Sequence, residues 1–454
     1  MSTQRSRQNV TSAEAPGTQV TIASDLNLFV HHVESLASSF PFVNAILVAV
    51  QSSANEELNK YLAAHGKVTG RSGETINYTI GAEHVSKVNR LRNKLEQARH
   101  ASVIVPRSFV VALVSQFDSF LGRLMRALFF LKPEVLNAAD RTLSFAQLNS
   151  FRNVGDAREF IIEKEVESVL RKSHAEQFDW LENKFDIKLR VGLDVWPQFI
   201  EVTERRNLFV HSDGVVSSQY LQVCQRYNCQ LDDNLSAGKT LGIDEDYLRE
   251  AYRCIFEIGV KLAHVLWRKL APGDRQAADQ NLNEISFELM ARENFEMARR
   301  LLDFAMCVLK DYSSEQYRRI FLINRAQAYK WLGDEPKTLE ILQAEDWSAS
   351  SDKFTLAVAA LRDHFDYAAQ LMTKLGRDGE MKKEFYEEWP VFREFRNSQP
   401  FAKAFEKIFG VKFAIKEQAA PAIGSETRTD GKTNEAESMN TVPRSVPNTA
   451  KVNV

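Results

Sequence analysis

The sequence predicts a mainly α-helical protein. Glycine and proline are scarce, with 19 and 12 residues in a chain of 454, whereas an all-β fold with many tight turns needs more of both. The apolar residues between Val110 and Leu128 also recur at the 3.6-residue period of an amphipathic helix. A chain of this length exceeds one ordinary core, so we expect it to form several domains.

A bundle of about five helices is expected in residues 101–272. Its first helix is expected to begin at Pro106, because proline suits the first turn of a helix. Pro197 lies in the first turn of another expected helix, and Gly214 follows the end of that helix. Residues 224–242 show no such period and are expected to form an insertion. The further helices are expected at residues 157–171, 173–183, 193–212 and 244–269.

The region before the bundle and the two ends of the chain have less regular sequence patterns. Residues 26–100 are expected to form a small N-terminal domain, and its fold is left open, α/β included. Two short strands are expected there, Asn44–Gln51 and Glu74–Ile80, beside helical stretches. Residues 1–25 and 417–454 are rich in small and polar residues and are expected to be disordered tails.

Residues 280–412 contain a repeated pattern. Asn294–Arg299 and His364–Ala369 are similar and lie 70 residues apart, which is about two tetratricopeptide repeats of roughly 34 residues. Between them, Ala328–Asp334 is similar to the helix-turn-helix corner of such a repeat. The segment therefore resembles degenerate tetratricopeptide repeats and is expected to form helical hairpins. An ordinary helical domain is the alternative.

Charge and apolar content bear on partners and location. The formal net charge is -2, so no global field attracts nucleic acid, and RNA binding requires a local patch. The N-terminus lacks the apolar core of a signal peptide, and we expect no apolar stretch of about 18 residues that would span a membrane. A cytoplasmic protein is therefore expected. Cys224 and Cys229 lack a matching second pair, so we expect no metal and no cofactor.

The most informative motif is Arg206-Asn207-Leu-Phe-Val-His211, late in an expected helix. Arginine neutralises phosphate with a planar fork of donors, and histidine is suited to move a proton near pH 7. Asn207 and His211 are four residues apart, so the carboxamide is expected to hydrogen-bond the imidazole. Arg206 and His211 are about 140° apart around an ideal helix. Both can meet one phosphate only near a helix end or in a cleft shared with another subunit.

With its flanking residues, the motif resembles the HEPN superfamily, over roughly residues 100–270. Glu204 lies just upstream and Gly214 just downstream, as in many ribonuclease members. The resemblance implies a metal-independent endoribonuclease, in which a ribose 2′-OH attacks the adjacent phosphorus. His211 would move the proton and Arg206 would stabilise the added charge. The products would carry 2′,3′-cyclic phosphate and 5′-OH ends. The resemblance also implies a homodimer with two motifs facing one cleft.

Two acidic residues are expected to support this site. Asp118 lies in an otherwise apolar helical stretch, at a position where similar sequences have an acid, so it is expected to orient Arg206 or His211. Glu204 is a weaker supporting residue. Structural alternatives remain for each group. Asp118 is equally explained as an exposed residue, Arg206 as a surface partner of Glu204 or Glu201, and His211 as a helix-end residue favoured by the helix dipole.

Two functions are compatible with these observations. The first is a ribonuclease that acts on RNA as a toxin or antiviral effector, dimerises through the bundle and binds a protein partner or antitoxin through the C-terminal repeats. The second is a non-catalytic, dimeric HEPN-like scaffold whose repeats bind protein partners. The intact motif from Arg206 to His211 favours the first, and the near-neutral charge slightly favours the second.

Overall fold

The computed structural model describes residues 21–72, 75–137, 143–377, 379 and 381–413. These residues are mainly helical, as expected. The expected C-terminal tail, 417–454, lies outside the described residues, and so do residues 1–20 of the expected N-terminal tail. Residues 22–25 instead begin the first helix, where Thr21 and Ser24 form a capping box.

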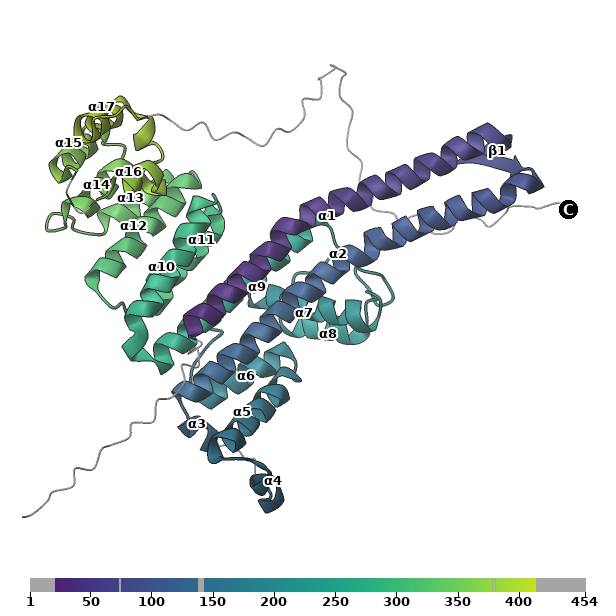
Figure 1. Ribbon diagram of the computed structural model, residues 1–454, viewed down its shortest axis with the longest axis horizontal. Helices are drawn as coiled ribbons and strands as arrows, with labels where there is room; N and C mark the ends of the chain where they lie inside the picture. Colours follow the sequence, from purple (N-terminus) through teal and green to yellow (C-terminus); the bar gives the residue numbers. More distant parts are fainter. Residues whose placement is uncertain (1–20, 73–74, 138–142, 378, 380, 414–454) are drawn as a thin grey trace, which may run out of the picture.

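Two long helices form an antiparallel hairpin that dominates the shape of the molecule (Figure 1). They are α1 (Ile22–His65) and α2 (Ala82–Leu131). The strands β1 (Gly66–Ser72) and β2 (Thr75–Ile80) join them as an antiparallel pair with Gly66 opposite Ile80. The far half of this hairpin, with its strands, projects from the rest of the protein as an arm.

The structure corrects the expected N-terminal domain. The expected strand Asn44–Gln51 is wrong, because these residues lie within α1, whereas the strand expected at Glu74–Ile80 is confirmed as β2. Leu26 and Phe29 of α1 are fully buried in the main core, and the expected boundary near residue 100 falls within α2. Residues 44–51 are themselves mostly exposed, whereas Phe40 before them and Ala54 and Leu58 after them are buried. Packing on either side thus keeps this apolar, β-branched segment in the helix despite its local strand preference.

Pro106 lies inside α2 rather than at its start. Pro41 lies inside α1 at nearly the same level of the hairpin. This level follows from the neighbouring rings of Phe40 and Phe109, whose centroids are 5.1 Å apart. An interior proline costs a helix about 3 kcal/mol. The apolar contacts that continue on both sides of Pro106 offset this cost.

The base of the hairpin packs against a helical bundle. The four helices expected at 157–171, 173–183, 193–212 and 244–269 are confirmed to within a few residues as α5, α6, α7 and α9. The helices of this region are α3 (Glu134–Asn137), α4 (Phe145–Ser150), α5 (Val154–Leu170), α6 (His174–Phe185), α7 (Trp196–His211), α8 (Ser218–Arg226) and α9 (Glu245–Leu270).

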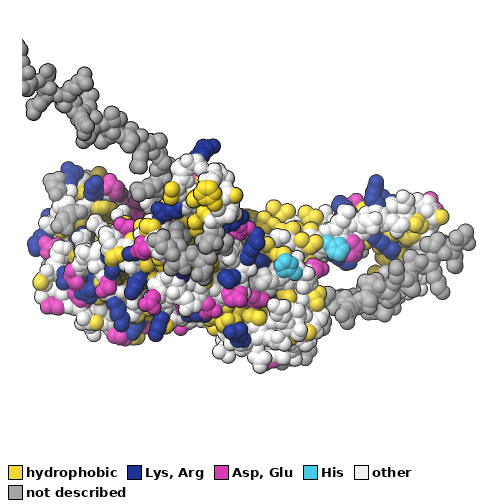
Figure 2. Space-filling model, turned by 90° about the horizontal axis from the view of Figure 1, so that it is seen from below, with side chains coloured by type: hydrophobic (Ala, Val, Ile, Leu, Met, Phe, Trp, Pro, Cys, Tyr) yellow, Lys and Arg dark blue, Asp and Glu magenta, His cyan; other side chains and the backbone are white. Residues whose placement is uncertain are grey.

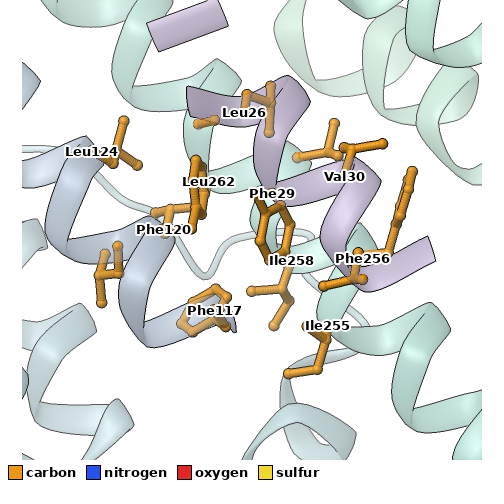
Figure 3. Close-up of a cluster of buried hydrophobic side chains, with 14 of the residues drawn as sticks. Leu26, Phe29, Val30, Phe117, Phe120, Leu124, Ile255, Phe256, Ile258 and Leu262 are labelled. Atoms are coloured by element: carbon orange, nitrogen blue, oxygen red, sulfur yellow. The ribbon is translucent and has the colours of Figure 1, made fainter. Parts of the chain in front are cut away.

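The bundle core joins α1, α2 and α9 (Figure 3). The Phe29 ring of α1 stacks on Phe120 of α2, with centroids 4.6 Å apart. On the α9 side, Ile255, Phe256 and Leu262 are buried. Residues far apart in the sequence therefore form one apolar core, in which α1 is an integral part.

Gly259 of α9 is expected to be needed for the close approach of α1. A Cβ at this position would lie 2.2 Å from a ring carbon of Phe29, so Gly259→Ala should lower the free energy of unfolding by about 1–3 kcal/mol through overpacking. Urea denaturation measures the loss. Gly273→Ala is the control, because no atom lies within 4 Å of its Cβ position. Equal stability of the two variants would contradict this view of the α1–α9 contact.

The C-terminal part, from residue 272 onward, is a succession of short helices. Its first hairpins continue the bundle core, and the later ones form a second core rich in aromatic residues. The elements are η1 (Pro272–Asp274), α10 (Arg275–Ala291), α11 (Phe295–Asp303), η2 (Phe304–Leu309), α12 (Glu315–Trp331), α13 (Glu335–Gln343), α14 (Asp352–Leu361), α15 (Phe365–Leu375), α16 (Lys383–Glu388), η3 (Pro390–Phe392), η4 (Phe395–Asn397) and α17 (Gln399–Phe409).

The repeated sequence pattern corresponds to a repeated turn. Glu293, Gly333 and Asp363 all have positive φ, and each lies between two helices of a hairpin. In each turn the following residue donates its backbone N–H to the carbonyl five residues earlier, at 2.8, 3.0 and 2.9 Å. This is the six-to-one bond that ends helices at a left-handed residue. The expected helical hairpins are therefore present, and these three have turns of the same geometry.

The expectation that no stretch is long and apolar enough to cross a membrane is wrong. Both α1 and α2 contain such a window of 18 residues, by length and composition. Only 11% of the α1 window and 39% of the α2 window are buried. Figure 2 shows apolar side chains gathered where the arm leaves the body. In the two helices of the hairpin, Phe42, Ile46 and Ile104 are exposed. A cytoplasmic location therefore stays a prediction.

Candidate functional site

The motif lies in the second half of α7, and the helix ends where the sequence indicates. Pro197 is in its first turn and His211 is its last residue. Beyond it, Asp213 and Gly214 adopt positive φ, and the N–H of Gly214 bonds the carbonyl of Leu208 at 3.0 Å. A Cβ on Gly214 would lie 3.1 Å from the Arg107 guanidinium. Glycine at position 214 therefore permits both the positive φ and the close approach of the Arg107 guanidinium at the end of α7.

Asp118 and Arg206 form an ion pair between α2 and α7. Arg206 Nη2 donates to Asp118 Oδ2 at 2.6 Å, and the two side chains are 21% and 26% exposed. The expectation that Asp118 orients Arg206 thus has a direct contact behind it. The alternative that Arg206 pairs with Glu201 is wrong, because Glu201 pairs with Arg205 instead. Glu204 does lie close enough for its charge to interact with that of Arg206.

His174, at the start of α6, is a third member of this cluster. Its Nε2 lies 2.9 Å from Asp118 Oδ1, so one carboxylate contacts both an imidazole and a guanidinium. The His174 side chain is buried beside the rings of Phe117 and Phe199. His174 was not predicted from the sequence. Its only signal is its place directly after Ser173, the N-cap of α6.

Asn207 contacts its neighbours on α7 rather than His211. Its Oδ1 accepts from Arg206 Nη1 at 3.1 Å, and its side chain hydrogen-bonds Glu204. The expected bond from Asn207 to the imidazole is therefore wrong in this conformation. Burial raises the pKa of the Glu204 carboxyl, opposed by the hydrogen bond from Asn207 and by the nearby His174 and Arg206. Glu204 thus belongs to the same polar cluster.

His211 is exposed at the end of α7. Within the described part of the chain, no hydrogen bond or ion pair engages its side chain, and none joins it to Arg206. The two residues are about 140° apart around the helix. Arg206 is held toward α2, while His211 remains accessible to a ligand from solvent.

Arg107 of α2 holds the turn after His211. Its Nη1 donates to the backbone oxygen of Asp213 at 3.0 Å and to Asp213 Oδ1 at 2.8 Å, and its Nη2 donates to the Leu241 oxygen at 3.1 Å. Its guanidinium also lies over the Phe209 ring, 5.4 Å from the centroid. Arg107 was missed, although a single arginine within the apolar run before Val110 is a usable signal. It places a second arginine near His211.

The expected insertion after α8 also closes on this end of α7. The N–H of Val216 donates to the Lys239 oxygen at 2.8 Å, and the N–H of Leu241 donates to the Gly214 oxygen at 2.9 Å. An isolated bridge pairs Val215 with Thr240. The segment is thus a local cover for the turn that follows His211.

A buried polar network anchors the first half of α7. The Glu201 carboxylate accepts from Arg205 at 2.7 Å, from the Tyr220 hydroxyl at 2.7 Å and from the Tyr247 hydroxyl at 2.8 Å. Burial first, and the Glu201 charge second, raise the pKa of Tyr220 and of Tyr247. The Arg205 guanidinium lies over the Tyr247 ring, 3.9 Å from its centroid. This network ties α7 to α8 and α9.

The site can therefore offer a fixed cation and an accessible imidazole on one helix. Across the described ranges, no three His, Cys, Asp or Glu side chains are grouped so as to hold a metal ion. Comparison with known protein families, curated proteins and solved structures finds no match to this chain. The resemblances to HEPN domains and tetratricopeptide repeats therefore stay predictions from the motifs.

Proposed function

We propose that this protein is a metal-independent endoribonuclease of the HEPN type. The observation that carries the proposal is the motif on α7, in which Asp118 holds Arg206 and the accessible His211 ends the helix. A cation that neutralises phosphate and a group that moves a proton are the two requirements of this chemistry. DNA lacks the attacking hydroxyl and should not be cut.

In the proposed reaction, the 2′-OH oxygen forms a bond to the adjacent phosphorus, and the bond from phosphorus to the 5′-oxygen breaks. His211 takes or delivers the proton, and Arg206 stabilises the added negative charge on the phosphate. Asp118 and Asn207 hold the guanidinium in place. The 2′-OH loses a proton and the leaving 5′-oxygen gains one; His211 carries out one of these two transfers and water the other. The products therefore carry 2′,3′-cyclic phosphate and 5′-OH ends.

One observation favours a second candidate, a non-catalytic scaffold of the same architecture. Arg206 already has a carboxylate partner, and Asp118 also contacts the buried His174. The cluster can therefore serve to hold α2, α6 and α7 together without acting on RNA. The two candidates differ in what they require of His211, since its exposed imidazole makes no hydrogen bond or ion pair with the residues that the structure describes.

Expression in a bacterial host tests the proposal. Induction of the wild-type chain is expected to arrest growth and to degrade cellular RNA, whereas His211→Ala, made at the same level, should do neither. His100→Ala is the control, because His100 is an exposed histidine on the arm. Equal RNA integrity with the wild type and His211→Ala would support the scaffold.

We also propose that the protein is a cytoplasmic homodimer formed through the bundle. Arg206 and His211 diverge by about 140° around α7, so one subunit supplies only half a cleft. Exposed apolar side chains near this end of the helix, Val103, Ile104 and Val210, are available for such a contact. The helical hairpins at residues 280–412 would bind a protein partner or antitoxin and thereby control a toxin or antiviral effector.

Mixing two inactive chains tests the dimer. If one site uses arginine from one subunit and histidine from the other, Arg206→Ala and His211→Ala chains should form mixed dimers that recover partial RNA cleavage. Sedimentation should give about twice the chain mass of 51.7 kDa. A fully active monomer would contradict the shared cleft.

A further inference from the structure

A cavity of about 490 Å³ lies within the C-terminal hairpins, between α10, α12, α14 and α16. This volume is in the range of sites that bind small ligands or side chains. The rings of Phe287, Phe385 and Trp389 contribute to its walls, and those of Phe385 and Trp389 lie with centroids 5.0 Å apart. The cavity belongs to a different part of the molecule from the α7 motif.

Gln327 of α12 lines this cavity and is only 1% exposed. Its Nε2 is buried and has no hydrogen-bond partner in the described chain. The neighbouring amide of Asn324, which also lines the cavity, is by contrast satisfied, because its Nδ2 donates to Asn283 Oδ1 at 2.9 Å. A buried donor without a partner is unfavourable. A ligand with an acceptor oxygen would remove this cost.

The charges around the cavity are mainly negative. Glu284, Glu384 and Glu388 line it and are exposed, against one ammonium group, Lys353, which lies over the Phe354 ring. Within the described residues, no ion pair engages Glu384 or Glu388. The carboxylates therefore favour a cation, and the aromatic walls suit an apolar group or a cation.

We propose that this cavity binds a basic peptide segment of a partner protein. An apolar side chain enters between the aromatic walls, and an adjacent lysine or arginine pairs with Glu384 and Glu388. The Gln327 amide turns about its last side-chain bond, so that Nε2 faces the cavity and donates to a peptide carbonyl. This assigns a chemistry to the partner that the proposed function places on the hairpins. A peptide carries the apolar group, the acceptor and the cation together, whereas a simple alkylamine lacks the acceptor.

The test measures binding to the full chain by calorimetry, with no RNA present. The probes are acetylated hexapeptides that contain two residues from Leu, Ile, Phe and Trp followed by two from Lys and Arg, and the same set with Glu in the basic positions. Basic members should bind and acidic members should not. Failure of the whole basic set, or equal binding of the acidic set or of hexylamine, would overturn the proposal.

Two sets of variants test whether the peptide binds in the cavity, as opposed to effects of altered stability or overall charge. Gln327→Leu should weaken the best basic peptide by roughly tenfold, because a buried donor to the ligand is lost, yet leave the melting temperature of the free chain unchanged or higher. A clear fall in melting temperature would mean that the fold itself satisfies Gln327, and would overturn the assignment. Glu388→Gln should weaken binding, whereas Glu387→Gln on the same helix, outside the cavity lining, should not.

His211→Ala distinguishes this proposal from the ribonuclease. That variant should bind the peptide as the wild type does, since the cavity shares no residue with the α7 motif. Loss of peptide binding in His211→Ala would contradict an independent site. Peptide binding by a chain that fails to cut RNA would leave the cavity assignment intact and remove only the proposed catalysis.

Discussion

Arg206→Ala and His211→Ala are each expected to lower the rate of RNA cleavage by on the order of 10²-fold. The first removes the cation that faces the developing charge, and the second removes the group that moves the proton. Single-turnover rates with purified protein, RNA in trace and EDTA present measure both losses. The effect is expected in the rate of cleavage rather than in RNA affinity alone, because each group acts on the transition state.

Matched controls separate this effect from a general loss of charge. Arg226→Ala removes an exposed arginine of α8, and His100→Ala removes an exposed histidine of the arm. Both should leave the rate within about twofold, since exposed groups away from the site do not act on the transition state. Cleavage that survives Arg206→Ala and His211→Ala, or falls equally in the controls, would contradict the assigned roles.

Glu201→Ala is expected to lower the free energy of unfolding by about 3–5 kcal/mol. Glu201 is 5% exposed and accepts three hydrogen bonds. Its loss would leave the Arg205 guanidinium buried without its carboxylate, and the hydroxyls of Tyr220 and Tyr247 without acceptors. Breaking one side of a buried pair costs more than the pair contributes, because the remaining charge stays desolvated. Urea denaturation followed by circular dichroism measures the loss.

Glu250→Ala is the control for this stability effect. Glu250 lies on α9 and pairs with Arg253 at 2.6 Å, but its side chain is 45% exposed. Its loss should cost less than about 1 kcal/mol. A small effect of Glu201→Ala, close to that of Glu250→Ala, would mean that the network around α7 contributes little to stability.

Local sequence signals predicted the helices that carry the site. Pro197 and Gly214 delimit α7 to within a few residues, because a first-turn proline and a left-handed glycine have direct conformational causes. The corner at Gly333 was predicted instead from the similarity of Ala328–Asp334 to the turn of a tetratricopeptide repeat. Signals of this kind depend on a few neighbouring residues and are read directly from the chain.

Tertiary packing decided what the local signals misjudged. Asn44–Gln51 has the composition of a strand, yet it forms part of α1, because the helix is packed on either side of it, at Phe40 and at Ala54 and Leu58. Pro106 reads as a helix start, but the helix continues through it. A contact between residues more than 50 positions apart, such as Asp118 with His174, leaves no local pattern at all.

Only part of the candidate site was predicted, because some of its contacts join distant helices and leave no local pattern. The motif named Arg206 and His211, and Asp118 was named from its place in an apolar helix. The spacing alone indicates a contact between Asn207 and His211, whereas the structure has Asn207 in contact with Arg206 and Glu204. Arg107 and His174 depend on how α2 and α6 cross α7, which spacing does not reveal.

The chemistry of the RNA ends tests the central claim most directly. Purified wild-type protein should cut a mixed-sequence RNA in the presence of EDTA, and mass spectrometry of the products should find 2′,3′-cyclic phosphate and 5′-OH ends. The 2′-deoxy strand of the same sequence should remain intact under the same conditions. Products with 3′-OH and 5′-phosphate ends, cleavage of the deoxy strand, or a requirement for Mg²⁺ would contradict attack by the 2′-OH at the Arg206–His211 site.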